Sequence, residues 1–185
     1  IVRQAKAGEK LITLDEVERE LDPQDCIIAD ASKPLCIAGV LGGANSGVTE
    51  TTKNIYLEGA YFDSVRVRKT AKRHAINSDA SYRYERGVDP NATIDAHAYA
   101  VALLCELTGG TASARDNKGQ QEFPRVEIAF SQSKVLKLIG VELDAAKITQ
   151  ILELLDFEIK SVEDDFWTVS VPSYRVDVTR DVDVA

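Results

Sequence analysis

A glycine cluster, an isolated carboxylate and a long polar motif are the features whose residue types and spacing could do chemistry. The glycines lie in Ala-Gly-Val-Leu-Gly-Gly at 38–43, and the carboxylate is Glu58 within the apolar run 56–62. The motif at 78–90 closes this stretch of the chain. Glycine lets a backbone approach a ligand closely. A carboxylate in an apolar run is costly to bury, so it is expected to pair with another group or to serve in binding. Together these features predict a pocket with one polar determinant, suited to discriminating a single hydroxyl group.

Ordinary structural roles remain open for the same residues. Glu58 could form a salt bridge with a nearby arginine, and Gly42 could be a simple turn glycine. The local pattern favours Ser78 as a helix N-cap. His74 could act as a general base, but its position at the end of a basic helix disfavours that role.

Positive charge is concentrated in one part of an acidic chain. The formal net charge is −8, which argues against a dedicated nucleic-acid-binding domain. Between positions 66 and 86, however, seven cations face only two acidic residues; the cations are Arg66, Arg68, Lys69, Lys72, Arg73, Arg83 and Arg86. Such a strip could contact a phosphate backbone, or it could be the solvated face of a helix.

The bulk composition is that of a soluble globular protein, with 44% hydrophobic and 28% charged residues in 185. That length allows one large domain or two small ones. No apolar run approaches the roughly 20 residues of a membrane span. The three cysteines lack metal-type spacing and indicate reduced thiols in a cytoplasmic protein. The absence of methionine predicts that the chain is a piece of a larger protein.

Hydrophobic patterning predicts strands in the first third of the chain and a mixture of helices and strands after it. The expected strands are 10–14, 26–29, 35–41, 56–62 and 126–130, with a hairpin formed by 157–162 and 166–171. The expected helices are 63–74, capped by Asp63, 92–107, 131–139 and 144–155, capped by Asp144. The polar segment 111–124 is expected to be a linker.

Long ordered runs of this sequence resemble the β subunit of bacterial phenylalanyl-tRNA synthetase. The matching segments are 38–43, 46–50, 57–58 with 60–62, 81–90 and 172–177. The resemblance covers essentially the whole chain and implies an α+β fold. It places residues 1–123 in a mixed sheet-plus-helix B3/B4-type editing domain, truncated at its N-terminus. It places residues 124–185 in a small β-α-α-β-β B5-type domain, truncated at its C-terminus.

The resemblance implies a proofreading hydrolase that removes tyrosine wrongly esterified to tRNA(Phe). A hydrophobic pocket built for phenylalanine rejects an added hydroxyl only weakly. A second site that binds the hydroxyl is therefore needed to remove tyrosine. Two alternatives remain: a non-catalytic tRNA-positioning or subunit-assembly module of the same enzyme, and a general nucleic-acid binder. The net charge of −8 conflicts with the last of these.

Position by position, the resemblance assigns the pocket residues. Glu58 matches the glutamate that recognises the tyrosine phenol, and an ionised carboxylate accepts a hydrogen bond from a phenol. Gly42 matches a glycine in the pocket wall, and Ala38 and Gly39 are expected to line the same wall. The family also places a histidine and an arginine upstream of the segment that matches Leu11, outside this chain.

The ester-binding end of the pocket is expected at Ser78 and Ala80. Ser78 is the expected catalytic residue, because its hydroxyl could position the attacking water. The family often carries threonine there, and serine retains the hydroxyl. Hydrolysis would then need neither a side-chain base nor a cofactor, since backbone groups and one hydroxyl can hold water against an activated ester.

The resemblance also implies partners and a metal. Contacts with tRNA(Phe) are expected from Arg66, Lys69 and Arg73, and the parent enzyme is expected to be an α₂β₂ assembly with an α subunit. Asp177 and Asp183 match two ligands of a Mg²⁺ site shared with that subunit, and oxygen ligands suit Mg²⁺. The two glutamates expected to complete the site lie beyond Ala185, so an exposed acidic tail is the alternative.

Overall fold

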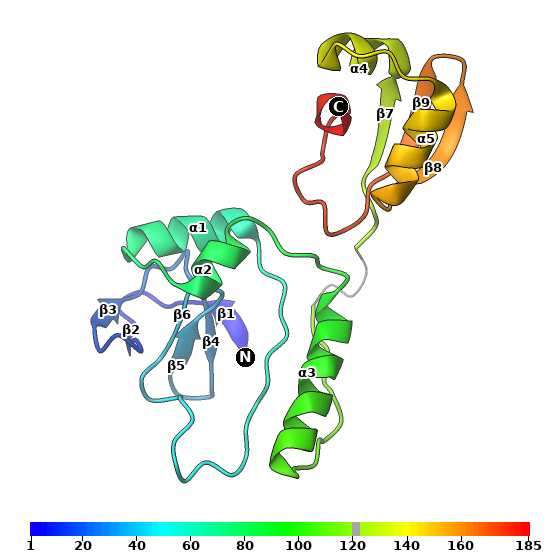
Figure 1. Cartoon of the computed structure of the whole chain (residues 1–185). Coiled ribbons are helices and arrows are strands. Elements are labelled where there is room, and N and C mark those ends of the chain that lie inside the picture. The colour runs from blue at the N-terminus through cyan, green and yellow to red at the C-terminus, as the bar shows by residue number, and fades with distance from the viewer. Residues whose placement is uncertain (120–122) are drawn as a thin grey trace. The chain divides into compact units, whose positions relative to one another are not determined.

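The computed structural model describes residues 1–119 and 123–185, which form two compact units, Ile1–Val88 and Asp89–Ala185 (Figure 1). Both units combine sheets with helices, so the predicted α+β class is confirmed. The division at 88/89 lies upstream of the domain boundary expected at 123/124. That boundary stays a prediction. No helix in the described part of the chain is both long and apolar enough to span a bilayer.

The first unit is built on a four-stranded antiparallel sheet with the order β1-β4-β5-β6. Its strands are β1 (Val2–Gln4), β4 (Cys26–Ala29), β5 (Pro34–Ile37) and β6 (Leu41–Gly42). A separate hairpin joins β2 (Lys10–Ile12) to β3 (Glu18–Glu20). The sequence analysis predicted β2, β4 and β5 but missed the short polar strands β1 and β3.

One face of this sheet forms the core, because strand residues alternate between the two faces. Ile27 and Ile37 are fully buried on the inner face. Helix α1 (Ser64–Arg73) covers that face with Val67 and Ala71. The helix begins at its predicted cap, where the Asp63 side chain accepts a hydrogen bond from the Arg66 N–H at 2.8 Å.

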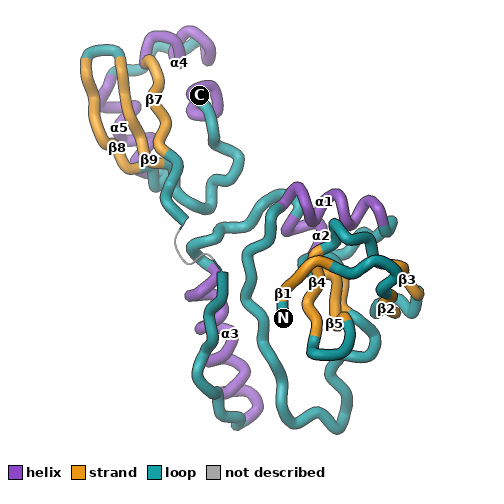
Figure 2. Tube along the Cα trace, turned by 180° about the vertical axis from the view of Figure 1, so that it is seen from behind, coloured by secondary structure: helices purple, strands orange, loops and turns teal. Residues whose placement is uncertain are grey.

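One of the predicted strands is interrupted and another is absent. The 35–41 run breaks at Gly39, which has φ +68°, and the Val40 N–H closes the turn onto the Ile37 carbonyl at 3.0 Å. The 56–62 run lies outside every sheet, within the long segment between β6 and α1 that is drawn entirely as loop in Figure 2. Because no strand pairs with it, β-prone residues there form no ladder.

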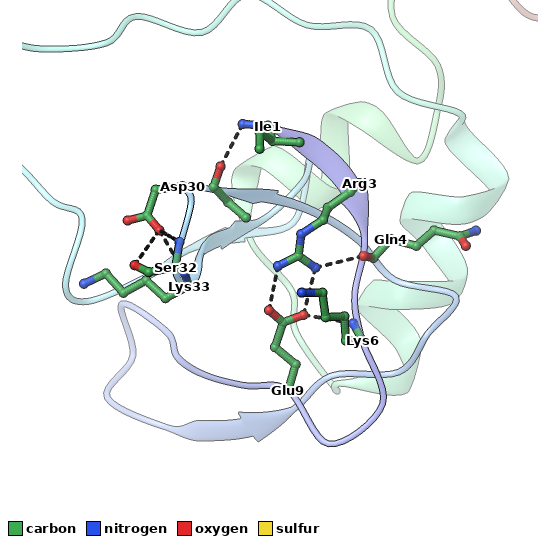
Figure 3. A network of polar contacts seen from close by, with 9 residues as sticks. Ile1, Arg3, Gln4, Lys6, Glu9, Asp30, Ser32 and Lys33 are labelled. Atoms are coloured by element: carbon green, nitrogen blue, oxygen red, sulfur yellow. Dashed lines mark hydrogen bonds and ion pairs between the residues drawn. The ribbon is translucent and has the colours of Figure 1, made fainter.

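An ion pair fastens β1 to the loop that precedes β2 (Figure 3). The Arg3 guanidinium donates to both Glu9 carboxylate oxygens, at 2.7 and 2.9 Å, and the Lys6 N–H donates to one of them at 2.9 Å. The hydrogen bonds from Arg3 lower the pKa of Glu9 from 4.5 to about 2. This carboxylate is therefore more stable in its ionised form in the folded protein than in the unfolded chain.

Lowering the pH from about 4.5 to about 2 is expected to remove the stability that Glu9 contributes. The sign follows from the lowered pKa, since the unfolded chain takes up the proton first. Chemical denaturation at several pH values should show a smaller loss of stability across this window for Glu9→Gln than for the wild type. Glu16→Gln, which changes an exposed glutamate of the same unit, serves as the control. Equal pH dependence in Glu9→Gln and the wild type would contradict the assignment.

The second unit carries one long helix and a small domain with the predicted β-α-α-β-β order. The long helix is α3 (Thr93–Thr108). The domain comprises β7 (Glu127–Ser131), α4 (Gln132–Ile139), α5 (Ala145–Leu154), β8 (Glu158–Glu163) and β9 (Phe166–Ser170), followed by the short helix η1 (Asp181–Val184). The sheet order is β7-β9-β8, with both pairs antiparallel.

Side-chain caps and left-handed glycines mark the helix ends of this unit, including the predicted cap at Asp144. Ser131 and Asp144 accept hydrogen bonds at the starts of α4 and α5, and Gly109 and Gly140 adopt left-handed conformations after α3 and α4. Trp167 is 1% exposed at the centre of the domain core. The expected linker has no helix or strand at 111–119, while its residues 120–122 lie outside the described part.

Candidate functional site

Ser78 joins the glycine turn to the following helix. Its hydroxyl donates to the Val40 carbonyl and accepts the Ser81 N–H at 3.0 Å. The Ser81 hydroxyl in turn accepts the Ser78 N–H at 3.0 Å. This reciprocal capping box starts α2 (Asp79–Tyr84), so the helix-cap role that the local pattern favoured is confirmed.

The hydrogen-bond pattern limits what Ser78 can do chemically. Its single hydroxyl proton is directed at a backbone carbonyl, so the group has no proton to donate elsewhere. The oxygen can still accept a hydrogen bond from a neighbouring group. Ala80 is half-buried on α2, two residues further along.

The expected wall residues fall into two groups. Gly39 lies beneath the side chains of Phe62, Val67 and Tyr84, which a Cβ would meet at 3.0, 3.1 and 3.4 Å. Ala38 is 3% exposed, and its N–H donates to the Cys26 carbonyl at 2.9 Å. Both residues therefore pack against the hydrophobic core of the first unit at the 37–40 turn.

Gly42 is less crowded than Gly39. A Cβ added at Gly42 would meet only the Leu14 side chain, at 3.1 Å. In β6 it is the direct cross-strand partner of Cys36 in β5. Paired residues of adjacent strands project from the same face of a sheet, so Gly42 and Cys36 share one face.

The sequence analysis missed two cysteines and a tyrosine that lie near Glu58. The negative charge of Glu58 adds to burial in raising the pKa of Cys26, of Cys36 and of Tyr84. Burial is the larger cause at all three, and the pKa of Cys36 reaches about 11. The Tyr84 hydroxyl donates to the Ala60 carbonyl at 3.1 Å, which ties this ring to the loop that carries Glu58.

Both thiols belong to the outer face of the main sheet. Cys26 and Ile28 are half-buried and alternate with the buried Ile27 and Ala29 in β4. Cys36 is the cross-strand partner of Ile28 in β5. The alternation of buried and half-buried residues within each strand is visible in the sequence. The register between β4 and β5, which places Cys36 diagonally across from Cys26, is not.

Glu58 has no cationic partner in the described ranges 1–119 and 123–185, so the salt-bridge alternative is not observed there. Burial by surrounding protein atoms raises the pKa of its carboxyl group. The residue as a whole is exposed on its loop, where its carboxyl oxygens can accept a hydrogen bond. The group is an available hydrogen-bond acceptor next to a half-buried thiol face.

The predicted phosphate-binding cations differ in their availability. Arg66 and Lys69 are exposed on α1, whereas Arg73 is bonded to the Asp25 carboxylate and lies 3.8 Å from Asp22. Arg66 and Lys69 are therefore accessible on the α1 surface to a phosphate group, whereas Arg73 is already paired with carboxylates of this unit.

Asp25 is fully buried and holds the C-terminal end of α1 against the β3–β4 loop. Its carboxylate accepts from Thr70 at 3.0 Å and from the Asp22 N–H at 2.9 Å, and lies 2.6 Å from His74 Nε2. Burial acts to raise the pKa of Asp25, but the hydrogen bonds from His74, Asp22 and Thr70 lower it overall. The His74 side chain is 7% exposed, so it is positioned as a structural residue rather than a general base.

The two expected metal ligands are each paired with a neighbouring arginine. Arg175 donates to both Asp177 oxygens at 2.9 Å, and Arg180 donates to Asp183 at 2.8 Å. Within the described residues, no three His, Cys, Asp or Glu side chains are grouped as a metal would require. The pair alone does not fit a Mg²⁺ site.

Comparison with protein families identifies both parts of the chain. Residues 1–109 match the B3/4 domain, and residues 128–185 match the tRNA synthetase B5 domain. The chain therefore belongs to the B3/4 family and carries a B5 domain after it. This combination corresponds to the B3/4 and B5 region of phenylalanine–tRNA ligase beta subunits.

Curated relatives support the same assignment along the whole chain. The phenylalanine–tRNA ligase beta subunits of Carboxydothermus hydrogenoformans and Bacteroides thetaiotaomicron are each 43% identical over 100% of this chain. The beta subunit of Pseudomonas fluorescens is 37% identical over 99% of it. The chain spans 23% of the length of each of these relatives.

Proposed function

We propose that the first part of this chain is the editing site of a phenylalanine–tRNA ligase, which hydrolyses tyrosyl-tRNA(Phe). One observation carries the proposal: Glu58 presents a carboxylate without a cationic partner in the described residues, close to the half-buried Cys36 that pairs with Gly42. An acceptor beside an apolar face suits a phenol, which is an aromatic ring with one hydroxyl donor.

Discrimination follows from the cost of an unpaired acceptor. Tyrosine would donate a hydrogen bond from its phenolic hydroxyl to Glu58. Phenylalanine would displace water from the carboxylate without supplying a hydrogen-bond donor in its place. Leaving a desolvated acceptor without its partner costs about 1–3 kcal/mol, and more where the group is charged. A site of this kind therefore binds tyrosine in preference to phenylalanine, the opposite of a synthetic site for phenylalanine.

The hydrolytic step relies on positioning. An aminoacyl ester is already activated, so a water held at the right distance and angle can attack its carbonyl carbon. The Ser78 oxygen, fixed by Val40 and Ser81, would accept a hydrogen bond from that water, with Ala80 beside it. The water oxygen bonds to the carbonyl carbon and the bond from that carbon to the ribose oxygen breaks. A proton from the water passes to the ribose oxygen, which releases tyrosine and restores the ribose hydroxyl of the tRNA.

The remaining assignments concern the whole enzyme. We propose that Arg66, Lys69 and the partly paired Arg73 contact the tRNA backbone, and that the chain acts in the cytoplasm with an α subunit in an α₂β₂ assembly. A Mg²⁺ site at Asp177 and Asp183 would need further oxygen ligands from outside this chain. The proposed boundary between the B3/4 and B5 parts is 123/124.

Deacylation by the intact enzyme tests the proposal. Tyrosyl-tRNA(Phe) and phenylalanyl-tRNA(Phe), labelled in the amino acid, are incubated with the enzyme without ATP, and release is followed over time. Faster release of tyrosine supports the editing function. Equal, uncatalysed release of both amino acids would favour the alternative, a module that positions tRNA or assembles subunits.

Gly42→Ala is expected to lower tyrosine release by roughly tenfold or more while the fold is retained, because a small displacement of the substrate is costly. The added methyl meets only Leu14, whose side chain is 57% exposed and can turn away. Deacylation rate and thermal unfolding would be measured together. Gly43→Ala is the contrasting control, since its Cβ would lie 2.4 Å from the Leu35 carbonyl oxygen and should destabilise the fold. Full activity in Gly42→Ala would remove Gly42 from the pocket wall.

A further inference from the structure

Tyr82 and Arg86 form an exposed stacked pair at the end of α2. The Arg86 guanidinium carbon lies 3.6 Å from the centre of the Tyr82 ring. Its Nη1 donates to the Tyr82 carbonyl at 2.7 Å and to the Glu85 carboxylate at 2.9 Å. These bonds hold the guanidinium over the ring, while 54% of the tyrosine remains exposed. Neither side chain belongs to the hydrophobic core of the unit.

This pair stands one helical turn from the proposed ester-binding end. The Tyr82 N–H donates to the Ser78 carbonyl at 2.9 Å, so the two residues are neighbours along α2. An ester held near Ser78 would place the nucleoside that carries it within reach of Tyr82. The base of that nucleoside is a flat aromatic group joined to the ribose that bears the amino acid.

The charge around the pair favours a nucleic acid. Arg83 is exposed next to Tyr82, and α1, which lies beside α2 in Figure 1, exposes Lys69 and Lys72. Cations that follow a backbone, combined with an aromatic ring on which a base can stack, are the usual elements of single-strand recognition. A surface for an acidic peptide would need the cations but not the ring.

We propose that Tyr82 and Arg86 form a stacking platform for the terminal base of the tRNA, as the nucleoside part of the substrate whose aminoacyl part is bound near Glu58. This inference rests on the proposed editing function for the identity of the nucleic acid. The guanidinium covers one face of the Tyr82 ring and adds a cation beside it, so the platform would stack against the π-face of a base with its uncovered face. Loss of one such stack weakens binding by about 5- to 100-fold.

The test removes the ring from the protein and the base from the substrate in turn. The intact enzyme is given tyrosyl-tRNA(Phe) that ends in adenosine, or the same tRNA ending in an abasic ribose that carries the tyrosyl ester. We expect removal of the base to raise the KM for the wild type by about tenfold, and to have no further effect on Tyr82→Ala. Tyr82→Phe should restore the dependence on the base. Tyr99→Ala, at a tyrosine that is 72% exposed on α3, is the matched control.

A crosslinking readout separates this inference from the proposed function. The tRNA carries a photoreactive 8-azidoadenosine at its end, with tyrosine in a non-hydrolysable amide link, and the modified peptide is identified by mass spectrometry. Attachment within 79–86 supports the platform even where hydrolysis is absent, in which case only the editing proposal fails. Attachment elsewhere, or an equal cost of base removal in the wild type and Tyr82→Ala, overturns the platform.

Discussion

Glu58→Ala lowers the preference for tyrosine over phenylalanine by about 10- to 100-fold, the largest functional effect that we expect. The factor corresponds to the loss of one hydrogen bond to a charged group. Glu58→Gln should retain part of the preference, because its amide oxygen still accepts a hydrogen bond from a phenol. The measurement is the ratio of the two deacylation rates with the intact enzyme.

Glu50→Gln is the matched control for these variants. Glu50 is an exposed carboxylate on the same loop between β6 and α1, so its replacement changes the net charge equally without removing the acceptor beside Cys36. If Glu58→Ala edits with an unaltered preference for tyrosine, the role given to Glu58 is wrong. A loss in Glu50→Gln of equal size would point to the charge of the loop instead of one hydrogen bond.

Asp25→Ala is expected to destabilise the first unit by about 3–5 kcal/mol, the cost of breaking a buried charge pair by removing one partner. The variant leaves the nearly buried His74 and the Thr70 hydroxyl without this acceptor, and removes the closest carboxylate partner of Arg73. Hydrogen–deuterium exchange of the α1 amides in the intact protein measures the effect, since this carboxylate holds the end of that helix.

Asp22→Ala provides the comparison for Asp25. Its carboxylate lies 3.8 Å from Arg73 and is 40% exposed, and pairs of that kind contribute about 0–1 kcal/mol. Faster exchange along α1 in Asp25→Ala alone would support the buried anchor. Equal exchange in the two variants would show that the anchor contributes little.

The helix boundaries were predictable from the sequence because a cap acts within four residues. Asp63, Ser131 and Asp144 each accept a hydrogen bond from a backbone N–H three positions further on. The glycines that follow α3 and α4 supply the left-handed conformation that ends a helix. The short helix α2 escaped the pattern, although its cap at Ser78 was recognised.

The sequence predicts residues for the candidate site, which stay predictions, but it does not predict what surrounds them in the fold. The motif match pointed to Glu58, Gly42 and Ser78 in the chain. The register that pairs Gly42 with Cys36, and the fold of the loop that carries Glu58, depend on contacts between distant segments. Asp177 and Asp183, the expected metal ligands, show the same limit, since their side chains pair with the neighbouring Arg175 and Arg180.

By itself the sequence determined the α+β class and the helix caps, because these depend on local hydrogen bonds and hydrophobic periodicity. The residues of the candidate pocket stay predictions from ordered motifs. Only the tertiary structure decided that 56–62 is a loop, since a β-prone run becomes a strand only beside a partner. It also decided the buried contacts of Asp25 with Arg73 and His74, which lie 48 and 49 positions away. Contacts of that range form when the whole chain packs, and no local pattern encodes them.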